Sequence, residues 1–298
     1  MRFGLLGTGP WAAGTQAVAL AAHEQVELVG VWGRNPAKAE ALAAAHGARG
    51  YADVDALIAD VDAVAVALPP DVQAGLAMKA AEQGRHLVLD KPVALDVAAA
   101  DALVAAVDEH DLASLVFTTR RYVPSVAAFI AEAERTGGWY GATAVHHGSI
   151  FQPGNPFGAS PWRREHGGLW DVGPHQLSVL TPVLGRVTTV TAVDGPHHTA
   201  YLTLTHAGGA VSSVSLTVDA APAAAMHMVA LYGETGVAVL PEGDADAVTA
   251  FGILLDQFVA LVGAPDKRHP CDVRAGRDMV AVLAAAEEAA RAGRTVEL

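Results

Sequence analysis

The first 120 residues alternate between short apolar runs and helix-forming segments, and this alternation restricts the fold more than any other feature of the chain. The apolar runs include Arg2–Leu6, Ala63–Ala67 and His86–Leu89. They are continuous rather than alternating in polarity, as expected for strands that are covered by helices on both faces. Repeated strand–helix–strand units of this kind predict an α/β fold with a doubly wound parallel sheet.

The pattern changes after residue 120. We expect a loop rich in Pro, Gly and Asn up to about residue 166 and a helix over Val172–Leu184. Strand-like segments then follow one another across Gly-containing turns such as Ala207-Gly208-Gly209, which indicates an antiparallel sheet. The sequence therefore predicts two domains. The first covers residues 1–119. The second, residues 120–298, is an α+β domain with a large open, mainly antiparallel sheet, and its C-terminal helix could pack back on the first domain.

Composition excludes some functions. A formal net charge of −13 argues against nucleic acid as a partner, because nucleic-acid-binding proteins present basic patches. The single cysteine, Cys271, cannot form an intramolecular disulfide and suits a reducing compartment. No apolar stretch reaches the roughly 20 residues that a membrane span needs, and the apolar run at Phe3–Leu6 is too short for a signal sequence. We expect a cytoplasmic protein with no membrane partner.

A glycine motif follows the first strand. The segment Gly7-Thr8-Gly9-Pro10-Trp11-Ala12 fits the pattern G-x-G-x-x-[GA] between a strand and a helix. In such a turn the first glycine permits the tight bend, and the second lets a pyrophosphate approach the backbone. Pro10 has no N–H to offer the phosphate. The motif predicts a Rossmann dinucleotide-binding domain, and the alternative is a glycine-rich turn that binds nothing.

The end of the second strand bears on the choice of dinucleotide. An NAD site usually carries an acid there to bind the ribose hydroxyls, but this chain has Gly33, followed by Arg34, Asn35 and Lys38. Arg34 and Lys38 are four residues apart and could flank one anion. This favours the 2′-phosphate of NADP. The alternative is that Arg34 stacks on adenine and Lys38 is solvated, which leaves NAD usable.

A lysine stands at the end of another strand. The run Leu87–Leu89 leads into Asp90-Lys91-Pro92, and ligands of open α/β sheets bind just outside such strand ends. Lysine, unlike arginine, can lose its proton when its surroundings depress its pKa, so Lys91 is a candidate for proton transfer. The alternative is a solvated surface lysine.

An acid–imidazole pair appears in the second half of the chain. Asp171 and His175 are four residues apart, so they share a face if this segment is helical, with Pro174 in a first turn. The carboxylate could orient the imidazole and support its protonated form, or the pair could be a helix cap with a surface histidine. His146, His147, His197, His198 and Asp194 invite a metal interpretation, but adjacent histidines on a strand point to opposite faces, and we expect no metal.

Together the glycine turn, Asp90-Lys91-Pro92 and the Gly-Gly-x-x-Asp-x-x-x-His segment at residues 167–175 resemble the glucose–fructose oxidoreductase / inositol dehydrogenase / rhizopine catabolism (Gfo/Idh/MocA) family. The family pattern has Glu where this chain has Asp90, and His where it has Gln73. The resemblance implies catalytic roles for Lys91, Asp171 and His175. It also implies substrate contacts by Arg120, Tyr122, Trp162, Asp171 and His175. The cofactor contacts expected from the glycine turn, from the end of the second strand and from the resemblance together are Gly7, Thr8, Gly9, Pro10, Trp11, Gly33, Arg34, Asn35, Lys38, Leu68, Pro69, Gln73, Asp90, Lys91, Pro92, Trp162 and Arg163.

The resemblance also implies an activity: NAD(P)-dependent hydride transfer between nicotinamide and a secondary alcohol or carbonyl of a sugar- or polyol-like molecule, with the active site between the domains. One alternative is an NAD-dependent glycosidase or eliminase with transient redox and no net oxidation. A less favoured one is a non-enzymatic NADP-sensing regulator. The resemblance further implies a cis Lys91–Pro92 peptide and a homo-oligomer, dimer or tetramer, formed through the C-terminal sheet.

Overall fold

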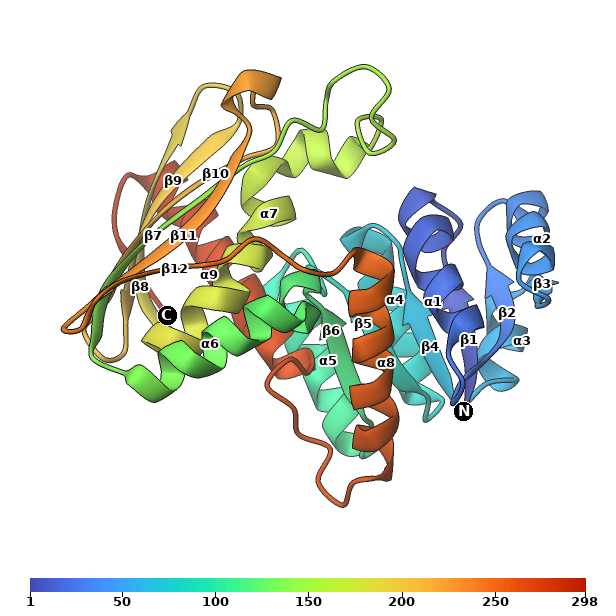
Figure 1. Ribbon diagram of the computed structural model, residues 1–298. Helices are drawn as coiled ribbons and strands as arrows, with labels where there is room; N and C mark the ends of the chain where they lie inside the picture. Colours follow the sequence, from blue (N-terminus) through green and yellow to red (C-terminus); the bar gives the residue numbers. More distant parts are fainter. The chain divides into compact units, whose positions relative to one another are not determined.

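The computed structural model describes residues 1–298, which divide into two compact units (Figure 1). Unit 1 consists of Met1–Tyr122 and Ala245–Val280, and unit 2 of Val123–Asp244 and Ala281–Leu298. The sequence suggested a single boundary at residues 119/120. The structure differs because helix α8 (Ala247–Gly263) belongs to the core of unit 1, where Phe258 packs on Phe3 and Phe251 on Phe117.

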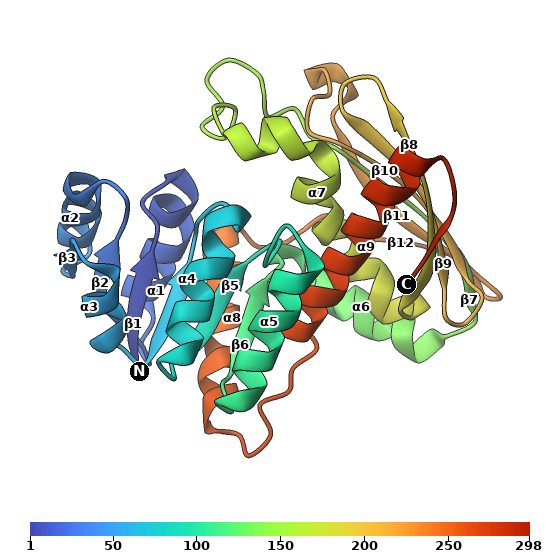
Figure 2. The ribbon, with the colours of Figure 1, turned by 180° about the vertical axis from the view of Figure 1, so that it is seen from behind.

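Unit 1 is built on a six-stranded parallel sheet in the order β3-β2-β1-β4-β5-β6. This confirms the predicted doubly wound fold. Helices α1 and α8 lie on one face, and α4 and α5 on the other (Figures 1 and 2). The strands are β1 (Arg2–Leu6), β2 (Glu27–Trp32), β3 (Arg49–Tyr51), β4 (Ala63–Val66), β5 (His86–Asp90) and β6 (Ser114–Phe117). The helical segments are η1 (Ala12–Gln16), α1 (Ala17–Ala22), α2 (Pro36–Ala45), α3 (Val54–Ala59), α4 (Pro70–Glu82), α5 (Val97–Glu109) and η2 (Thr119–Tyr122).

Local chemistry explains these boundaries. The central strand β4 reads Ala-Val-Ala-Val and is buried along its whole length, which accounts for its continuous apolar run. The side chains of Asn35, Asp53 and Asp96 each accept a hydrogen bond from a backbone N–H in the first turn of a following helix. The edge strand β3 was not anticipated because it is three residues long and contains a glycine.

Unit 2 is built on a seven-stranded sheet in the order β12-β11-β7-β10-β9-β8-β13. Only β7 and β10 pair in parallel, and the other neighbouring strands are antiparallel, so the expected mainly antiparallel sheet is confirmed. The strands are β7 (Trp139–His147), β8 (Val187–Gly195), β9 (Thr199–His206), β10 (Val211–Thr217), β11 (Met226–Gly233), β12 (Gly236–Val239) and β13 (Val296–Glu297). The helical segments are α6 (Pro124–Thr136), α7 (Pro161–Leu184), η3 (Pro222–Ala224) and the end of α9 (Val273–Ala292), which begins in unit 1.

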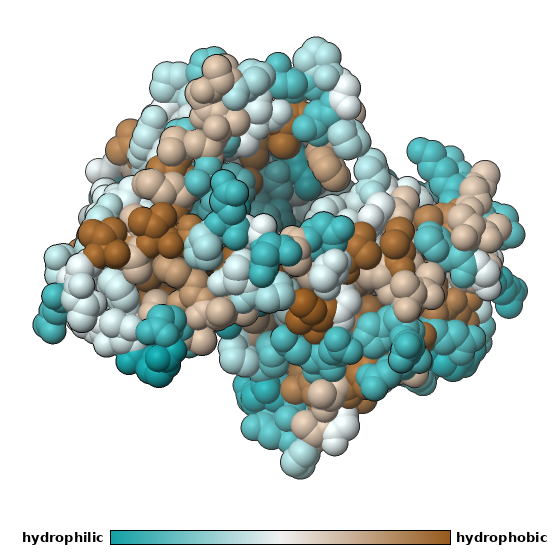
Figure 3. Space-filling model, viewed as in Figure 1, coloured by the Kyte–Doolittle hydropathy of each residue, from teal (hydrophilic) through white to brown (hydrophobic).

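The sheet of unit 2 has one covered face and one open face. Helix α7 packs against β7, β9 and β10. On the opposite face, Val193 and Tyr201 are 63% and 51% exposed. Exposed valines also lie in β12, on the side of unit 2 where hydrophobic side chains gather in Figure 3. Although α8 is apolar, no helix of the chain has both the length and the hydropathy to cross a membrane.

Helix α7 differs from the sequence expectation in two respects. It begins at Pro161, where a loop was expected, and it is broken at Gly167, whose φ of 61° and ψ of −156° are not helical. Pro174 was expected in a first turn but lies inside the helix, one and a half to two turns beyond the break. Its missing N–H leaves the helix without one internal hydrogen bond, which local sequence rules disfavour.

Candidate functional site

The glycine turn after β1 has room for a ligand at one glycine and none at the other. Gly7 has a φ of 137°, and a Cβ there would lie 2.4 Å from the carbonyl oxygen of Ala67. Its N–H donates to the Trp32 carbonyl at 2.8 Å, which ties the turn to β2. Gly9, by contrast, is exposed and has no heavy atom within 4 Å of the position of a Cβ. A phosphate can therefore approach the backbone at Gly9, as the motif predicts.

The segment after Gly9 turns directly into a helix. The N–H of Ala13 donates to the Gly9 carbonyl at 2.9 Å, so the helix begins at Pro10, and the segment Ala12–Gln16 is π-helical before α1. Trp11 stacks on Phe117 with 6.0 Å between ring centroids. The exposed Gly9 thus lies directly before a helix N-terminus, whose partial positive charge favours the phosphates of a dinucleotide.

The end of β2 explains why an acid is missing there. Gly33 is buried, and a Cβ at this position would lie 2.7 Å from Cγ2 of Thr8. A side chain at this position would therefore have to displace the side chain of Thr8 in the glycine turn. Arg34 and Lys38 are both exposed, and Asn35 between them caps α2 by accepting a hydrogen bond from the N–H of Lys38 at 3.1 Å. The two cations therefore flank a well-defined helix start.

Lys91 follows β5, and its backbone is held by Gln73 of α4. The amide of Gln73 accepts from the Asp90 N–H at 2.8 Å and donates to the carbonyls of Asp90 and Pro92 at 2.7 and 3.0 Å. Gln73 is fully buried, so its polar atoms serve the backbone around the lysine. The Asp90 carboxylate in turn accepts from the N–H of Lys91 at 2.8 Å, and the Lys91–Pro92 peptide is cis, as expected.

Three of the predicted cofactor segments share one edge of the sheet. Strands β1, β4 and β5 are parallel neighbours, and each is followed at its carboxyl end by predicted site residues. These are Gly7 after β1, Leu68 and Pro69 after β4, and Lys91 after β5. The structure thus brings together, within unit 1, segments that are up to 84 residues apart in the sequence. This is the edge at which ligands of such sheets bind.

Arg120 and Tyr122, two predicted substrate contacts, lie in η2 directly after β6. Tyr122 is a core residue: it is 2% exposed, packs on Phe117 and donates its hydroxyl to the Val116 carbonyl at 3.3 Å. Burial raises the pKa of Tyr122 well above its usual value. The Tyr122 hydroxyl is therefore not exposed, and the structure offers no support for the expected contact between this residue and the substrate. Arg120 is half-buried, and burial lowers its pKa to about 10.

In unit 2, α7 carries the other predicted catalytic residues. Asp171 and His175 both lie in the part of α7 after the Gly167 break, where the spacing of four puts them on one face. Asp171 is 5% exposed and accepts a hydrogen bond from Nε of Arg163 at 2.8 Å. Arg163, placed near the cofactor by the resemblance, is thus an ion-pair partner of the acid.

Aromatic rings hold this arginine. The guanidinium carbon of Arg163 lies 4.6 Å from the ring centre of Trp162 and 5.3 Å from that of Phe157. Both are cation–π distances. The break at Gly167 lets the first part of α7 turn so that Arg163, eight residues before Asp171, reaches its carboxylate. The helical pattern alone does not reveal this contact.

His175 has an imidazole neighbour that the sequence did not connect with it. The ring of His146 in β7 lies 5.9 Å from that of His175, and Gln176 Nε2 lies 3.1 Å from His146 Nδ1. His147 lies on the other face of the sheet and bonds Ser215 at 2.7 Å, so the two adjacent histidines do face apart. No three His, Cys, Asp or Glu side chains are arranged to hold a metal ion.

Comparison with known proteins finds similarity to oxidoreductases, mainly in the first part of the chain. Residues 1–118 match the family model described as an oxidoreductase family with an NAD-binding Rossmann fold. The chain is 34% identical over 126 residues to the UDP-N-acetylglucosamine 3-dehydrogenase of Acidithiobacillus ferrooxidans, which is 42% of this chain and 39% of that protein. It is 34% identical over 130 residues to the inositol 2-dehydrogenase of Rhizobium meliloti, 43% of this chain and 39% of the relative. The aligned regions thus span well under half of these curated relatives.

Solved structures resemble the whole chain. The WlbA dehydrogenase from Bordetella pertussis, determined with NADH and UDP-GlcNAcA, is 25% identical with a TM-score of 0.86. The comparison covers 100% of this chain and 98% of that one. The UDP-N-acetylglucosamine 3-dehydrogenase structure from A. ferrooxidans has a TM-score of 0.82 at 22% identity and covers 98% of both chains. The likeness extends the shared fold to both units.

Proposed function

We propose that this chain is a nicotinamide-dependent dehydrogenase of the Gfo/Idh/MocA type, because its residues 1–118 match the model of an oxidoreductase family with an NAD-binding Rossmann fold. It transfers a hydride between the cofactor and a secondary alcohol or carbonyl of a sugar- or polyol-like molecule. One observation carries the proposal. Lys91 is fixed by Gln73 at the strand end after β5, on the same sheet edge as the glycine turn that suits the cofactor's pyrophosphate.

The residues of this chain would position and polarise the substrate, while bound nicotinamide supplies the hydride acceptor or donor. In the direction of oxidation, His175 accepts the hydroxyl proton. The Lys91 ammonium binds the same oxygen and stabilises the negative charge that develops on it. Asp171, held by Arg163, orients a substrate hydroxyl or the His175 ring. In reduction the same groups act in reverse.

We further propose a preference for NADP over NAD. Arg34 and Lys38 are exposed on either side of the Asn35 cap, where a 2′-phosphate would meet two cations and the start of α2. Gly33 stands where an acid usually binds the ribose hydroxyls of NAD, so this chain lacks that carboxylate. Relatives of known structure bind NAD or NADH, so this preference would distinguish the chain from them.

The other two functions considered are less well supported. A glycosidase or eliminase cycle with transient redox would not accumulate reduced nicotinamide, whereas the relatives at 34% identity that have assigned activities are dehydrogenases. A regulator that only senses NADP would not need a lysine whose backbone is fixed at the strand end. It would also not need Arg163, Asp171 and His175 together on α7.

A substrate screen tests the proposed function. The full-length protein is incubated with NAD or NADP and with nucleotide sugars, polyols and anhydrosugars, including UDP-N-acetylglucosamine, myo-inositol and levoglucosan. We expect absorbance of reduced nicotinamide to grow in proportion to substrate consumed. Product formed without net accumulation of reduced cofactor would support the glycosidase or eliminase alternative. Tight cofactor binding with no turnover of any compound would support the regulator.

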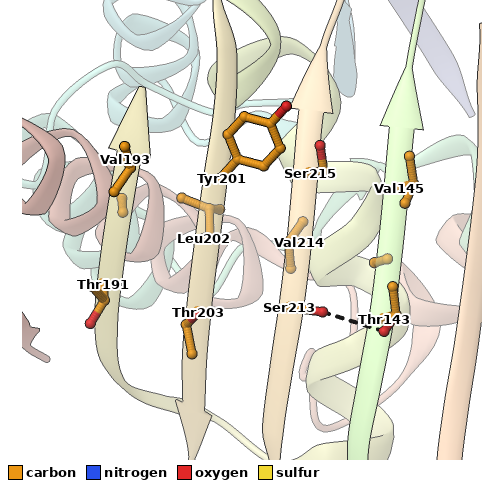
Figure 4. Close-up of a pocket in the computed structure, with 12 residues that line it drawn as sticks. Thr143, Val145, Thr191, Val193, Tyr201, Leu202, Thr203, Ser213, Val214 and Ser215 are labelled. Carbon is orange, nitrogen blue, oxygen red and sulfur yellow. Dashed lines mark hydrogen bonds between the residues drawn. The ribbon is translucent and has the colours of Figure 1, made fainter. Parts of the chain in front are cut away.

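We also propose that the chain forms a homo-oligomer, a dimer or tetramer, through the open face of the unit 2 sheet. A groove of about 350 Å³ runs over this face (Figure 4). Its lining combines apolar side chains such as Val193 and Tyr201 with small hydroxyl residues such as Ser213 and Thr143. The hydroxyl oxygens of Ser213 and Thr143 are 3.3 Å apart. Exposed apolar surface of this kind marks association sites. A monomer in sedimentation velocity at micromolar concentration would contradict this.

A cytoplasmic location is part of the proposal. The single cysteine, Cys271, is buried and unpaired, which suits a reducing compartment. The net charge of −13 suits a small-molecule enzyme that does not bind nucleic acid. Fractionation of cells that express the full-length protein would test the location.

A further inference from the structure

Three histidines of unit 2 lie in a row that begins at the proposed proton acceptor. His146 lies between the other two: its ring centre is 5.9 Å from that of His175 and 5.2 Å from that of His227. His175 and His146 are half-buried, whereas His227 is exposed to solvent. The row therefore runs from a partly buried ring on α7 to the surface.

The fold fixes this row through two independent packing relations. His146 and His227 are directly opposite each other in the antiparallel pair β7–β11, so their side chains share one face of the sheet. That face is the one covered by α7, which carries His175 and packs against β7 (Figure 1). Neighbouring imidazoles at these separations can exchange protons directly or through one water.

Gln176, the residue after His175, can serve His146 in two protonation states. Its amide is fully buried, with Nε2 3.1 Å from His146 Nδ1, and its Oε1 has no hydrogen-bond partner. The amide can therefore donate to an unprotonated Nδ1 or, after a flip, accept from a protonated one. In the second state Nε2 of His146 is the nitrogen that gains and loses a proton.

We propose that His146 and His227 form a proton relay between His175 and solvent. The inference rests on the proposed function. In oxidation, bound nicotinamide would take the hydride of the substrate's C–H bond, and the O–H bond would give its proton to His175. That proton passes to Nε2 of His146, then to His227 and finally to water or buffer. Each ring ends neutral, so one proton leaves for each alcohol oxidised, and reduction runs the same path inward.

Other titratable groups lie on the same two elements, α7 and β7. Asp171 lies one turn before His175 on α7 and is paired with Arg163. His166 packs edge-on against Trp170 with 6.2 Å between ring centroids. His147, next to His146 in β7, bonds Ser215 on the opposite face and gives a matched control. The relay thus predicts that removal of His227 changes the titration of His146 and, through it, that of His175. Removal of His147 should change neither titration.

The first test needs no substrate. Ring ¹⁵N resonances of the full-length protein, labelled at histidine, are followed against pH in the wild type, His227→Ala and His147→Ala. Removing the repulsion of a protonated His227 should raise the titration midpoint of His146 and, to a smaller extent, that of His175. His147→Ala should shift neither midpoint. The relay is overturned if His227→Ala leaves both midpoints unchanged.

The second test uses turnover on whichever of UDP-N-acetylglucosamine, myo-inositol and levoglucosan the wild type oxidises fastest. In dilute buffer, His227→Ala and His146→Gln should lower kcat about tenfold, less than the roughly 10²- to 10⁴-fold of a direct acid–base residue. Added imidazole should restore both variants and leave the wild type and His147→Ala unchanged. Normal rates in the variants, or a loss that imidazole does not restore, would overturn the relay. A wild type inactive on every probe would count against the proposed function, and the ring titrations would still decide the relay.

Discussion

The glycine turn of unit 1 and helix α7 of unit 2 both carry predicted site residues, but they are built in different ways. The glycine turn is a backbone structure whose shape follows from a few consecutive residues: Gly7 has no space for a side chain, and Gly9 leaves its backbone open. Helix α7 is a side-chain structure whose contacts come from distant residues. Arg163 reaches Asp171 across the Gly167 break, and His146 reaches His175 from another strand.

This difference indicates how each region tolerates change. In the glycine turn a single methyl group decides whether the chain can fold and whether a phosphate can approach. On α7 a lost side chain leaves the backbone in place but removes an ion pair or a proton acceptor. Cofactor binding and catalysis should therefore respond to different substitutions. The variants below test this difference, in order of decreasing expected effect.

Lys91→Met should separate chemistry from cofactor binding most clearly. We expect kcat to fall by roughly 10² to 10⁴, the range for lost acid–base or electrostatic help. The dissociation constant of the cofactor should change little, because we propose that the backbone of the glycine turn, and not this side chain, binds the pyrophosphate. Steady-state kinetics and calorimetric titration measure the two effects. Near-normal turnover would make Lys91 structural and break the distinction.

Replacing both Arg34 and Lys38 with Ala asks whether side chains also matter for cofactor binding by unit 1. Each lost charge-assisted hydrogen bond to a 2′-phosphate should cost about 1.5–3 kcal/mol. The dissociation constant for NADP should therefore rise steeply, while that for NAD stays nearly constant. Equal affinities for NAD and NADP in the unmodified protein would refute the proposed preference.

Gly7→Ala should destabilise unit 1 by at least about 3 kcal/mol, because it combines a positive φ with a Cβ 2.4 Å from a carbonyl oxygen. Gly9→Ala is the matched control: its Cβ meets no atom, so stability should be kept while cofactor affinity falls. Denaturant unfolding with and without NAD or NADP distinguishes the two. Equal loss of stability in both variants would refute this description of the turn.

Arg163→Ala should destabilise unit 2 and lower kcat. Removal of one partner leaves the buried Asp171 carboxylate uncompensated, which should cost about 2 kcal/mol. This is less than for a fully buried pair because the Arg163 side chain is 21% exposed. Arg164→Ala, its exposed neighbour over Phe151, should cost less than about 1 kcal/mol and leave kcat unchanged. A similar response in both variants would show that the ion pair has no particular role.

Stability against pH should show the smallest effect. Burial lowers the pKa of His86 and His269 in unit 1 and of His206 in unit 2. Below the ordinary histidine pKa of about 6.5, the unfolded chain therefore binds more protons than the folded one, and stability falls as pH decreases. The slope per histidine stays below the roughly 1.4 kcal/mol per pH unit of one full proton.

The unequal distribution of these histidines between the units refines this expectation. Hydrogen exchange of β5 amides, next to His86, and of β9 and β10 amides, next to His206, should both accelerate between pH 7 and pH 5.5 after correction for intrinsic rates. His206→Asn should flatten the response of β9 and β10 alone, since His206 bonds Gly185 and Ser212 within unit 2. Slower corrected exchange at the lower pH would contradict a loss of stability on acidification.

The sequence by itself determined what depends on neighbouring residues. Continuous apolar runs, separated by glycine-containing turns, predicted the parallel sheet of unit 1 and the positions of most of its strands and helices. They also predicted the place of the glycine turn. The sequence indicated Lys91 as a candidate because it follows an apolar run, and Asp171 and His175 as candidates because of their spacing. These features arise from backbone geometry and local periodicity, which a single segment carries by itself.

Only the tertiary structure decided what depends on residues far apart in the chain. It assigned Ala245–Val280 to unit 1, because the aromatic rings of α8 fill that core. It paired Arg163 with Asp171 and placed His146 beside His175, and it turned Gln73 towards the backbone of Asp90. It also buried Tyr122. Such contacts follow from packing and strand order, because side-chain partners across a fold leave no regular spacing in the sequence.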